Sequence, residues 1–173
     1  MNKTKIKIGV LGGSFDPAHK GHLAISKEAK KRFKLKKVIW AITKKNPFKT
    51  ESKTSISDRV KFCKKIIGTN SFIKVKFYEK IIKSNKTINL INHLKKDKNI
   101  EIYFLMGADN LINFHKWHKF KIISQKCNIL VFDRHGYKKN SLKSKTFKQL
   151  SKTNLEFIEF NKVNISSSQL RKI

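Results

Sequence analysis

The stretch IKIGVLGGSFDPAHKGHLAISKEAKKRF, residues 6–33, decides the fold of this chain. Its apolar run, Ile6–Leu11, predicts a buried strand, and the helical spacing of apolar residues over Leu23–Phe33 predicts a helix. The glycines and the proline between the two predict a tight turn from the strand into the helix N-terminus. Such a turn presents backbone N–H groups and the positive end of a helix dipole, so it predicts an anion site.

The rest of the chain continues this alternation. Apolar runs predict strands at about 5–11, 37–42, 72–76, 100–106, 127–132 and 155–159. Helical patterns follow each strand except the last two, at about 21–33, 56–67, 87–96 and 109–124, the last one broken. Strands that alternate with helices form a parallel sheet covered on both faces. We therefore expect one α/β domain, residues 1–173, with a Rossmann-like, doubly wound, mostly parallel sheet of five to six strands.

Four segments that suit ligand binding come directly after predicted strands. They are Gly12–His22, Thr43–Thr50, Gly107–Asp109 and Asp133–Gly136. Ligands of open parallel sheets bind beyond the carboxyl ends of the strands, at the point where the strand order reverses. The sequence therefore predicts that these four segments form one site.

The composition is that of a basic globular protein, with 39% hydrophobic residues and a net charge of +30. No apolar run approaches the roughly 18–20 residues of a membrane span, and the N-terminus lacks a secretory signal. We therefore expect a cytoplasmic protein without a membrane partner. The charge favours approach of phosphorylated ligands. The same charge leaves open an alternative of a different class, a basic nucleic-acid-binding protein. Because the basic residues are spread over the whole chain, we do not expect a nucleic-acid partner. The two cysteines, Cys63 and Cys127, lie in apolar patterns and are expected as buried thiols.

The predicted helix start carries His19-Lys20-Gly21-His22. A spacing of three brings both imidazoles near one face of the first turn, where they can donate hydrogen bonds to phosphate oxygens. Gly21 leaves room for close approach of a ligand to the backbone. A structural turn, or a metal site formed by Asp16, His19 and His22, remains an alternative. The chain has neither GxxxxGK[ST] nor GxGxxG, so its phosphate site differs from both of those types.

Two motifs at opposite ends of the chain resemble the nucleotidylyltransferase superfamily, whose HxGH motif binds ATP phosphates. The first is GGSFDPxHxGH over residues 12–22, and the second is ISSSQLR over residues 165–171, similar to ISSTxIR. The resemblance covers roughly residues 6–173. It implies catalytic roles for His19, His22 and Arg171. The ATP site that it implies consists of Gly12, Gly13, Ser14, Phe15, His19, His22, Ser166, Ser167 and Arg171. The chain stops directly after the second motif, where many relatives add a helix, so it is either a short version or lacks its end.

Elements in the middle of the chain resemble the nicotinate-nucleotide adenylyltransferase branch of this superfamily. They are GADNL over residues 107–111, Trp117, and DRHGY over residues 133–137. The acceptor-binding residues that this resemblance implies are Lys49, Thr87, Gly107, Asp109, Trp117 and Arg134. Asp109 is equally suited to cap the helix that it opens, and Trp117 and Arg134 also fit ordinary packing and surface positions.

The resemblance implies a reaction of NAD biosynthesis in which ATP and nicotinate mononucleotide give nicotinate adenine dinucleotide and pyrophosphate. The acceptor phosphate attacks the α-phosphate in line, without a covalent enzyme intermediate, and Mg²⁺ is held by ATP phosphates rather than by protein ligands. Leu90 and Lys86 stand where the family has a threonine and a tyrosine. Nicotinamide mononucleotide therefore remains an alternative acceptor, and phosphopantetheine remains one for a sister enzyme. The oligomeric state is left open.

Overall fold

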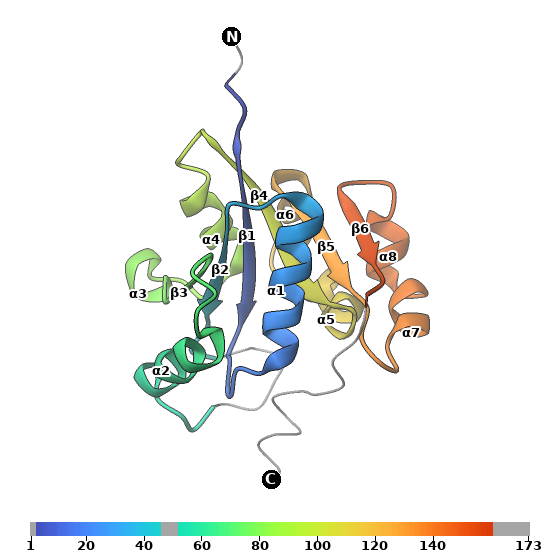
Figure 1. The fold of residues 1–173 in the computed structure, drawn as a ribbon. Helices are drawn as coiled ribbons and strands as arrows, with labels where there is room; N and C mark the ends of the chain where they lie inside the picture. The colour runs from blue at the N-terminus through green and yellow to red at the C-terminus, as the bar shows by residue number, and fades with distance from the viewer. Residues whose placement is uncertain (1–2, 46–51, 161–173) are drawn as a thin grey trace.

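The computed structural model describes residues 3–45 and 52–160, which form a six-stranded sheet (Figure 1). The strands follow the order β3-β2-β1-β4-β5-β6, and every pair of neighbours is parallel. Their bounds are β1 (Ile6–Gly13), β2 (Lys37–Ile42), β3 (Ile73–Lys76), β4 (Ile100–Gly107), β5 (Asn128–Phe132) and β6 (Leu155–Ile158). The predicted Rossmann-like, doubly wound sheet is confirmed.

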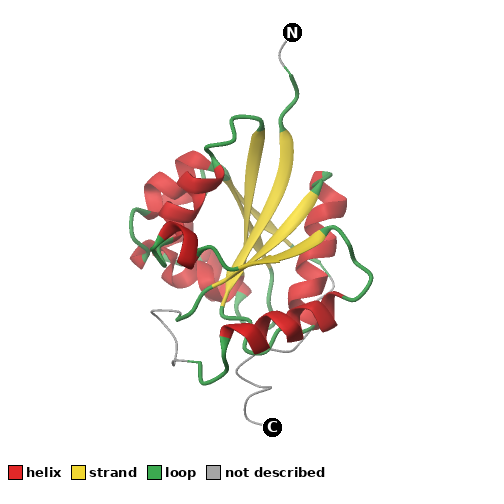
Figure 2. Cartoon of the chain, turned by 90° about the vertical axis from the view of Figure 1, so that its left-hand side faces the viewer, coloured by secondary structure: helices red, strands yellow, loops and turns green. Residues whose placement is uncertain are grey.

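Helices cover both faces of this sheet (Figure 2). Helices α1 (Lys20–Phe33) and α2 (Ile56–Ile67) pack on one face. Helices of the opposite face are α4 (Thr87–Leu94), α5 (Ala108–Asn113), α6 (Phe120–Lys126) and α8 (Lys145–Leu150). The remaining helical elements are α3 (Glu79–Ile82), the 3₁₀ turn Phe114–Lys116 and α7 (Lys138–Leu142). None of the helices within residues 3–45 and 52–160 is long and apolar enough to cross a membrane.

The apolar strands form elements buried on both sides because successive side chains point to opposite faces of the sheet. On β4, Ile102, Phe104 and Met106 belong to the core beneath α4, α5 and α6. Tyr103 and Leu105 belong to the core beneath α1 and α2. A continuous apolar run therefore supplies two separate cores from one strand.

The helices between β5 and β6 were not predicted, and the expectation that the fifth strand lacks a following helix is wrong. Helices α7 and α8 fill this crossover, and α8 packs on the core through Leu150. Their buried positions also include Ser141 and Thr146, both 0% exposed. Polar residues on the buried side hide the apolar periodicity by which a helix is recognised in sequence. The predicted break in 109–124 is confirmed, because α5, the 3₁₀ turn and α6 share that segment.

The strand order places the ligand-binding edge of the sheet at β1 and β4. From β1 the chain proceeds outward to β2 and β3, and it then returns to the other side of β1 to add β4, β5 and β6. The direction of winding therefore reverses between β1 and β4. Crevices at such switch points, outside the carboxyl ends of the strands, are where sheets of this kind bind ligands.

Candidate active site

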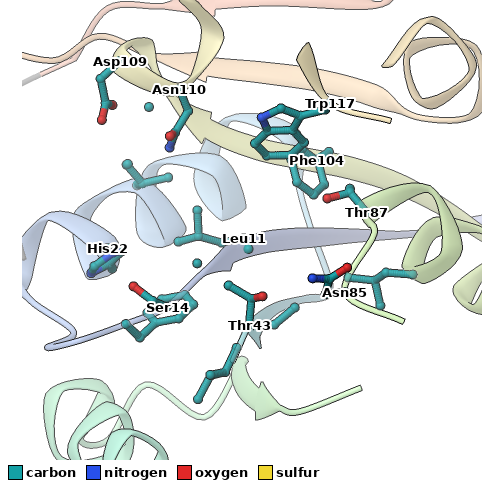
Figure 3. A pocket seen from close by; sticks show the side chains of 18 of the residues that line it. Leu11, Ser14, His22, Thr43, Asn85, Thr87, Phe104, Asp109, Asn110 and Trp117 are labelled. Atoms are coloured by element: carbon teal, nitrogen blue, oxygen red, sulfur yellow. The ribbon is translucent and has the colours of Figure 1, made fainter. Parts of the chain in front are cut away.

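A pocket of about 630 Å³ lies at this switch point (Figure 3). Every predicted site residue in the described part of the chain lines it, namely Gly12, Gly13, Ser14, Phe15, His19, His22, Thr87, Gly107, Asp109, Trp117 and Arg134. The structure thus brings together four parts of the sequence, at 12–22, 87, 107–117 and 134. The predicted site residues Lys49, Ser166, Ser167 and Arg171 lie outside the described residues.

Ser14, His19 and His22 form one side of this pocket, called here the phosphate wall. His19 is the N-cap of α1, and its Nδ1 accepts the N–H of Gly21 at 3.1 Å. The Nδ1 of His22 accepts the N–H of His19 at 3.1 Å, and the two ring centroids lie 3.9 Å apart. A neutral imidazole that accepts at Nδ1 carries its proton on Nε2. The cap therefore fixes both rings in a tautomer that donates from Nε2.

The same contacts bear on the alternative metal site at Asp16, His19 and His22. Both Nδ1 atoms are engaged with backbone N–H groups. Within residues 3–45 and 52–160 there is no group of three or more His, Cys, Asp or Glu side chains that could hold a metal ion.

Buried aromatic residues support the phosphate wall from behind. Phe15, 1% exposed, stacks on Trp40 with centroids 5.0 Å apart and lies 4.7 Å from the ring of His22. The indole Nε1 of Trp40 donates to Ser26 Oγ at 2.8 Å, and that hydroxyl donates to the carbonyl oxygen of His22 at 2.8 Å. The ring of Phe15 therefore packs against His22 from the protein interior. Trp40 and Ser26 were missed because their spacing resembles that of ordinary core residues.

Thr87, Phe104 and Trp117 form the opposite side, called here the ring wall, and Figure 3 shows them across the pocket from Ser14 and His22. The indole of Trp117 packs edge-on against Phe104 and Phe114, with centroid distances of 6.1 and 5.0 Å. These contacts hold a half-buried aromatic surface at the pocket. Trp117 therefore packs against neighbouring aromatic residues and also lines the pocket.

Asp109 and Arg134, which also line the pocket, form an ion pair. Arg134 Nη1 donates to Asp109 Oδ2 at 2.5 Å, and the guanidinium also lies 5.6 Å from the ring centroid of Tyr137. The alternative in which Asp109 caps α5 is wrong, because Gly107 is the N-cap and no side chain caps this helix. The carboxylate turns instead to the guanidinium, which charge attraction favours. A Cβ at position 107 would lie 2.6 Å from Asp109 Oδ1, so this carboxylate position requires glycine there.

Thr43, which opens one of the four predicted segments, lines the pocket, and so does Glu79, which was not predicted. The Thr43 hydroxyl donates a short hydrogen bond to Glu79 Oε1, and the N–H of Lys44 donates to Glu79 Oε2 at 3.2 Å. These bonds join the end of β2 to α3, which leads to the ring wall. Glu79 could have been singled out as an acidic residue, because the chain has eleven acidic residues against 41 basic ones.

The chain is similar to known proteins in sequence and in fold. The family model described as cytidylyltransferase-like matches residues 10–173. A probable nicotinate-nucleotide adenylyltransferase of Pelagibacter ubique (strain HTCC1062) is 69% identical over 173 residues, which are 100% of this chain and 96% of the relative. Another, from Clostridium perfringens, is 34% identical over 171 residues, covering 96% of this chain and 85% of the relative.

The fold is also found among solved structures. The nicotinic acid mononucleotide adenylyltransferase of Plasmodium falciparum complexed with NaAD has a TM-score of 0.77 at 22% identity, covering 96% of this chain and 83% of its own. At that identity the likeness concerns the fold. The sequence relatives carry the assignment further, because the 69% identity extends over nearly the whole length of both chains. The resemblance inferred from the motifs is thereby confirmed, and the chain belongs to the nicotinate-nucleotide adenylyltransferases of the cytidylyltransferase-like family.

Proposed function

We propose that this protein transfers the adenylyl group of ATP to nicotinate mononucleotide and releases pyrophosphate, a step of NAD biosynthesis, and that it does so as one domain in the cytoplasm. The observation that carries this proposal is the pocket itself. It combines a phosphate wall at a helix N-terminus with an aromatic ring wall, in a chain of this family. A dinucleotide product has both a phosphate bridge and a planar ring, which match the two walls.

The phosphate wall suits the charge that develops during the reaction. The Nε2–H groups of His19 and His22 are donors held in place by the cap of α1. The N-terminus of α1 adds the positive end of its dipole. In-line attack by the acceptor phosphate on the α-phosphate needs no protein nucleophile, so positioning and charge stabilisation supply the catalysis. A divalent cation, which we propose is Mg²⁺, would neutralise phosphate charge when bound with ATP.

The ring wall suits the pyridine ring of the acceptor. Trp117 offers an aromatic face for it, and Thr87 stands at the start of α4. Asp109 and Arg134 supply a carboxylate for a ribose hydroxyl and a guanidinium for the acceptor phosphate. Leu90 also lines this pocket, where a threonine would offer a hydroxyl. The ring substituent of the acceptor therefore meets an apolar side chain at that position.

Pyrophosphate release by the purified protein with ATP, Mg²⁺ and nicotinate mononucleotide tests the proposal. A parallel reaction with nicotinamide mononucleotide compares the two ring substituents as a ratio of kcat/KM values. We expect turnover with ATP and nicotinate mononucleotide. We also expect a higher kcat/KM for the acceptor with the carboxylate than for the one with the carboxamide. Absence of pyrophosphate at high enzyme concentration would sink the assignment, and a preference for the carboxamide would overturn the choice of acceptor.

A further inference from the structure

Arg59, on the first turn of α2, is 3% exposed and connects backbone segments that no motif links. Its Nη1 donates to the carbonyl oxygens of Ser14 and Thr43, each at 2.9 Å. Its Nη2 donates to Lys44 O at 3.2 Å, and its Nε donates to Thr54 O at 3.1 Å. One planar cation thus holds the turn after β1, the end of β2 and the residue before the cap of α2.

Two of these segments belong to the pocket. Ser14 is part of the phosphate wall, and Thr43 lies at the end of β2. The N–H of Thr43 donates to Gly13 O at 2.8 Å, so the two segments also touch directly. From Thr43 the hydrogen bond to Glu79 continues into α3. A series of bonds therefore runs from the phosphate wall through Arg59 and Thr43 toward the segment that leads to the ring wall.

The chemistry of the site requires arginine rather than lysine. A guanidinium has five N–H donors in fixed directions, whereas an ammonium is a compact charge with three donors. Burial lowers the pKa of Arg59, and the charges of Asp16 and Glu79 raise it. Arginine remains protonated in proteins under either influence. A permanent cation is therefore buried among carbonyl dipoles and near two carboxylates, which offset the cost of removing it from water.

We propose that Arg59 is a positioning residue of this reaction, which keeps the phosphate wall at Ser14 and the end of β2 at Thr43 at a fixed separation. The inference rests on the proposed function, because the separation matters when two substrates must meet in line. The four described hydrogen bonds of Arg59 all go to backbone carbonyl oxygens, so we assign it an effect through the backbone of the site. A misplacement of about 1 Å can lower a rate about 100-fold. The effect should therefore fall on kcat more than on either KM.

The variants Arg59→Ala and Arg59→Lys test this role, with Arg32→Ala as the matched control. Arg32 pairs with Glu28 at 2.5 Å and donates to Glu159 O at 2.8 Å, but its side chain is 42% exposed. We expect kcat to fall about 100-fold in Arg59→Ala and about 10-fold in Arg59→Lys, and to remain near the wild-type value in Arg32→Ala. Guanidinium ion at low millimolar concentration should restore part of the turnover of Arg59→Ala. A kcat within about threefold of wild type in a folded Arg59→Lys protein would overturn the proposal.

Hydrogen exchange supplies a readout that does not depend on activity. Peptides that cover residues 10–18 and 39–45 should both lose protection in Arg59→Lys, because one side chain holds both segments. Loss in neither peptide, or in one alone, would overturn the coupling even if wild-type turnover were normal. If Arg59→Ala does not fold, Arg59→Lys alone decides by both measurements. A wild-type protein without turnover would refute the proposed function while the exchange result still tests Arg59.

Discussion

The first turn of α1 gives His19 two roles that one pair of substitutions can separate. Its Nδ1 accepts the N–H of Gly21 as a helix cap. Its Nε2–H is the group that we propose donates a hydrogen bond to a phosphate oxygen of ATP. His19→Ala removes both the cap and the donor. His19→Asn keeps an acceptor that is favoured at N-caps and removes the imidazole. The two variants should therefore differ in stability and agree in their loss of turnover.

The magnitudes follow from the contacts. Replacement of an N-cap acceptor by alanine costs about 1 kcal/mol, which lowers Tm by about 2–4 °C for a chain of this size. We expect that loss in His19→Ala and a Tm within about 1 °C of wild type in His19→Asn. Removal of one preorganised donor from developing charge lowers kcat about 100-fold or more. We expect this loss in both variants.

Thermal unfolding followed by circular dichroism, and pyrophosphate release at saturating ATP and nicotinate mononucleotide, measure the two effects. A matched control is Ser144→Ala, which removes the cap of α8, where Ser144 Oγ accepts the N–H of Phe147 at 3.1 Å. It should lower Tm by a similar amount and leave kcat unchanged. Normal turnover in His19→Asn would refute the phosphate role. An unchanged Tm in His19→Ala would refute the cap as a source of stability.

Three further predictions concern the Asp109 carboxylate, the ring wall and the buried cysteines. Gly107→Ala should lower kcat/KM, because the new Cβ would lie 2.6 Å from the Asp109 carboxylate and displace it. The double variant with Asp109→Ala should lose no more kcat/KM than Asp109→Ala alone, and additive losses would contradict a shared cause. Trp117→Leu should raise the KM of nicotinate mononucleotide about 2- to 10-fold, the equivalent of about 0.5–1.5 kcal/mol of ring contact. An equal rise in the KM of ATP would argue against a ring-binding role. Burial raises the pKa of the Cys63 and Cys127 thiols to about 12, so an aromatic disulfide reagent at pH 8 should label them only as the protein unfolds, and fast labelling of the native protein would disprove their burial.

Much of the fold was accessible from sequence because its signals are local. Apolar runs mark buried strands wherever they lie in the chain, and a parallel sheet brings their carboxyl ends to one edge. Thr87 and Trp117, predicted for the acceptor, therefore line the same pocket as Ser14, predicted for ATP. The identity of the ligand depended on motifs instead, since an anion site at a helix N-terminus suits many phosphates.

The parts that escaped prediction depend on contacts without a local pattern. The ion pair of Asp109 and Arg134 joins residues 25 positions apart, and it outweighed the local tendency of aspartate to cap a helix. Arg59 binds carbonyl oxygens, and every residue of a chain carries one. No residue type at position 14 or 43 could mark that contact in advance. Only the arrangement of the backbone reveals it.

The basic composition becomes informative at its exceptions. The chain has 41 lysines and arginines, of which four are arginine. Lysine, a compact charge on a flexible stem, suits positions that need only a solvated charge. Each arginine in the described part makes contacts that use its planar fork. Arg59 holds four carbonyl oxygens, Arg134 joins Asp109 and lies over Tyr137, and Arg32 bridges a carboxylate and a distant carbonyl oxygen. In a chain this rich in lysine, the arginines therefore indicate where geometry, and not charge alone, is required.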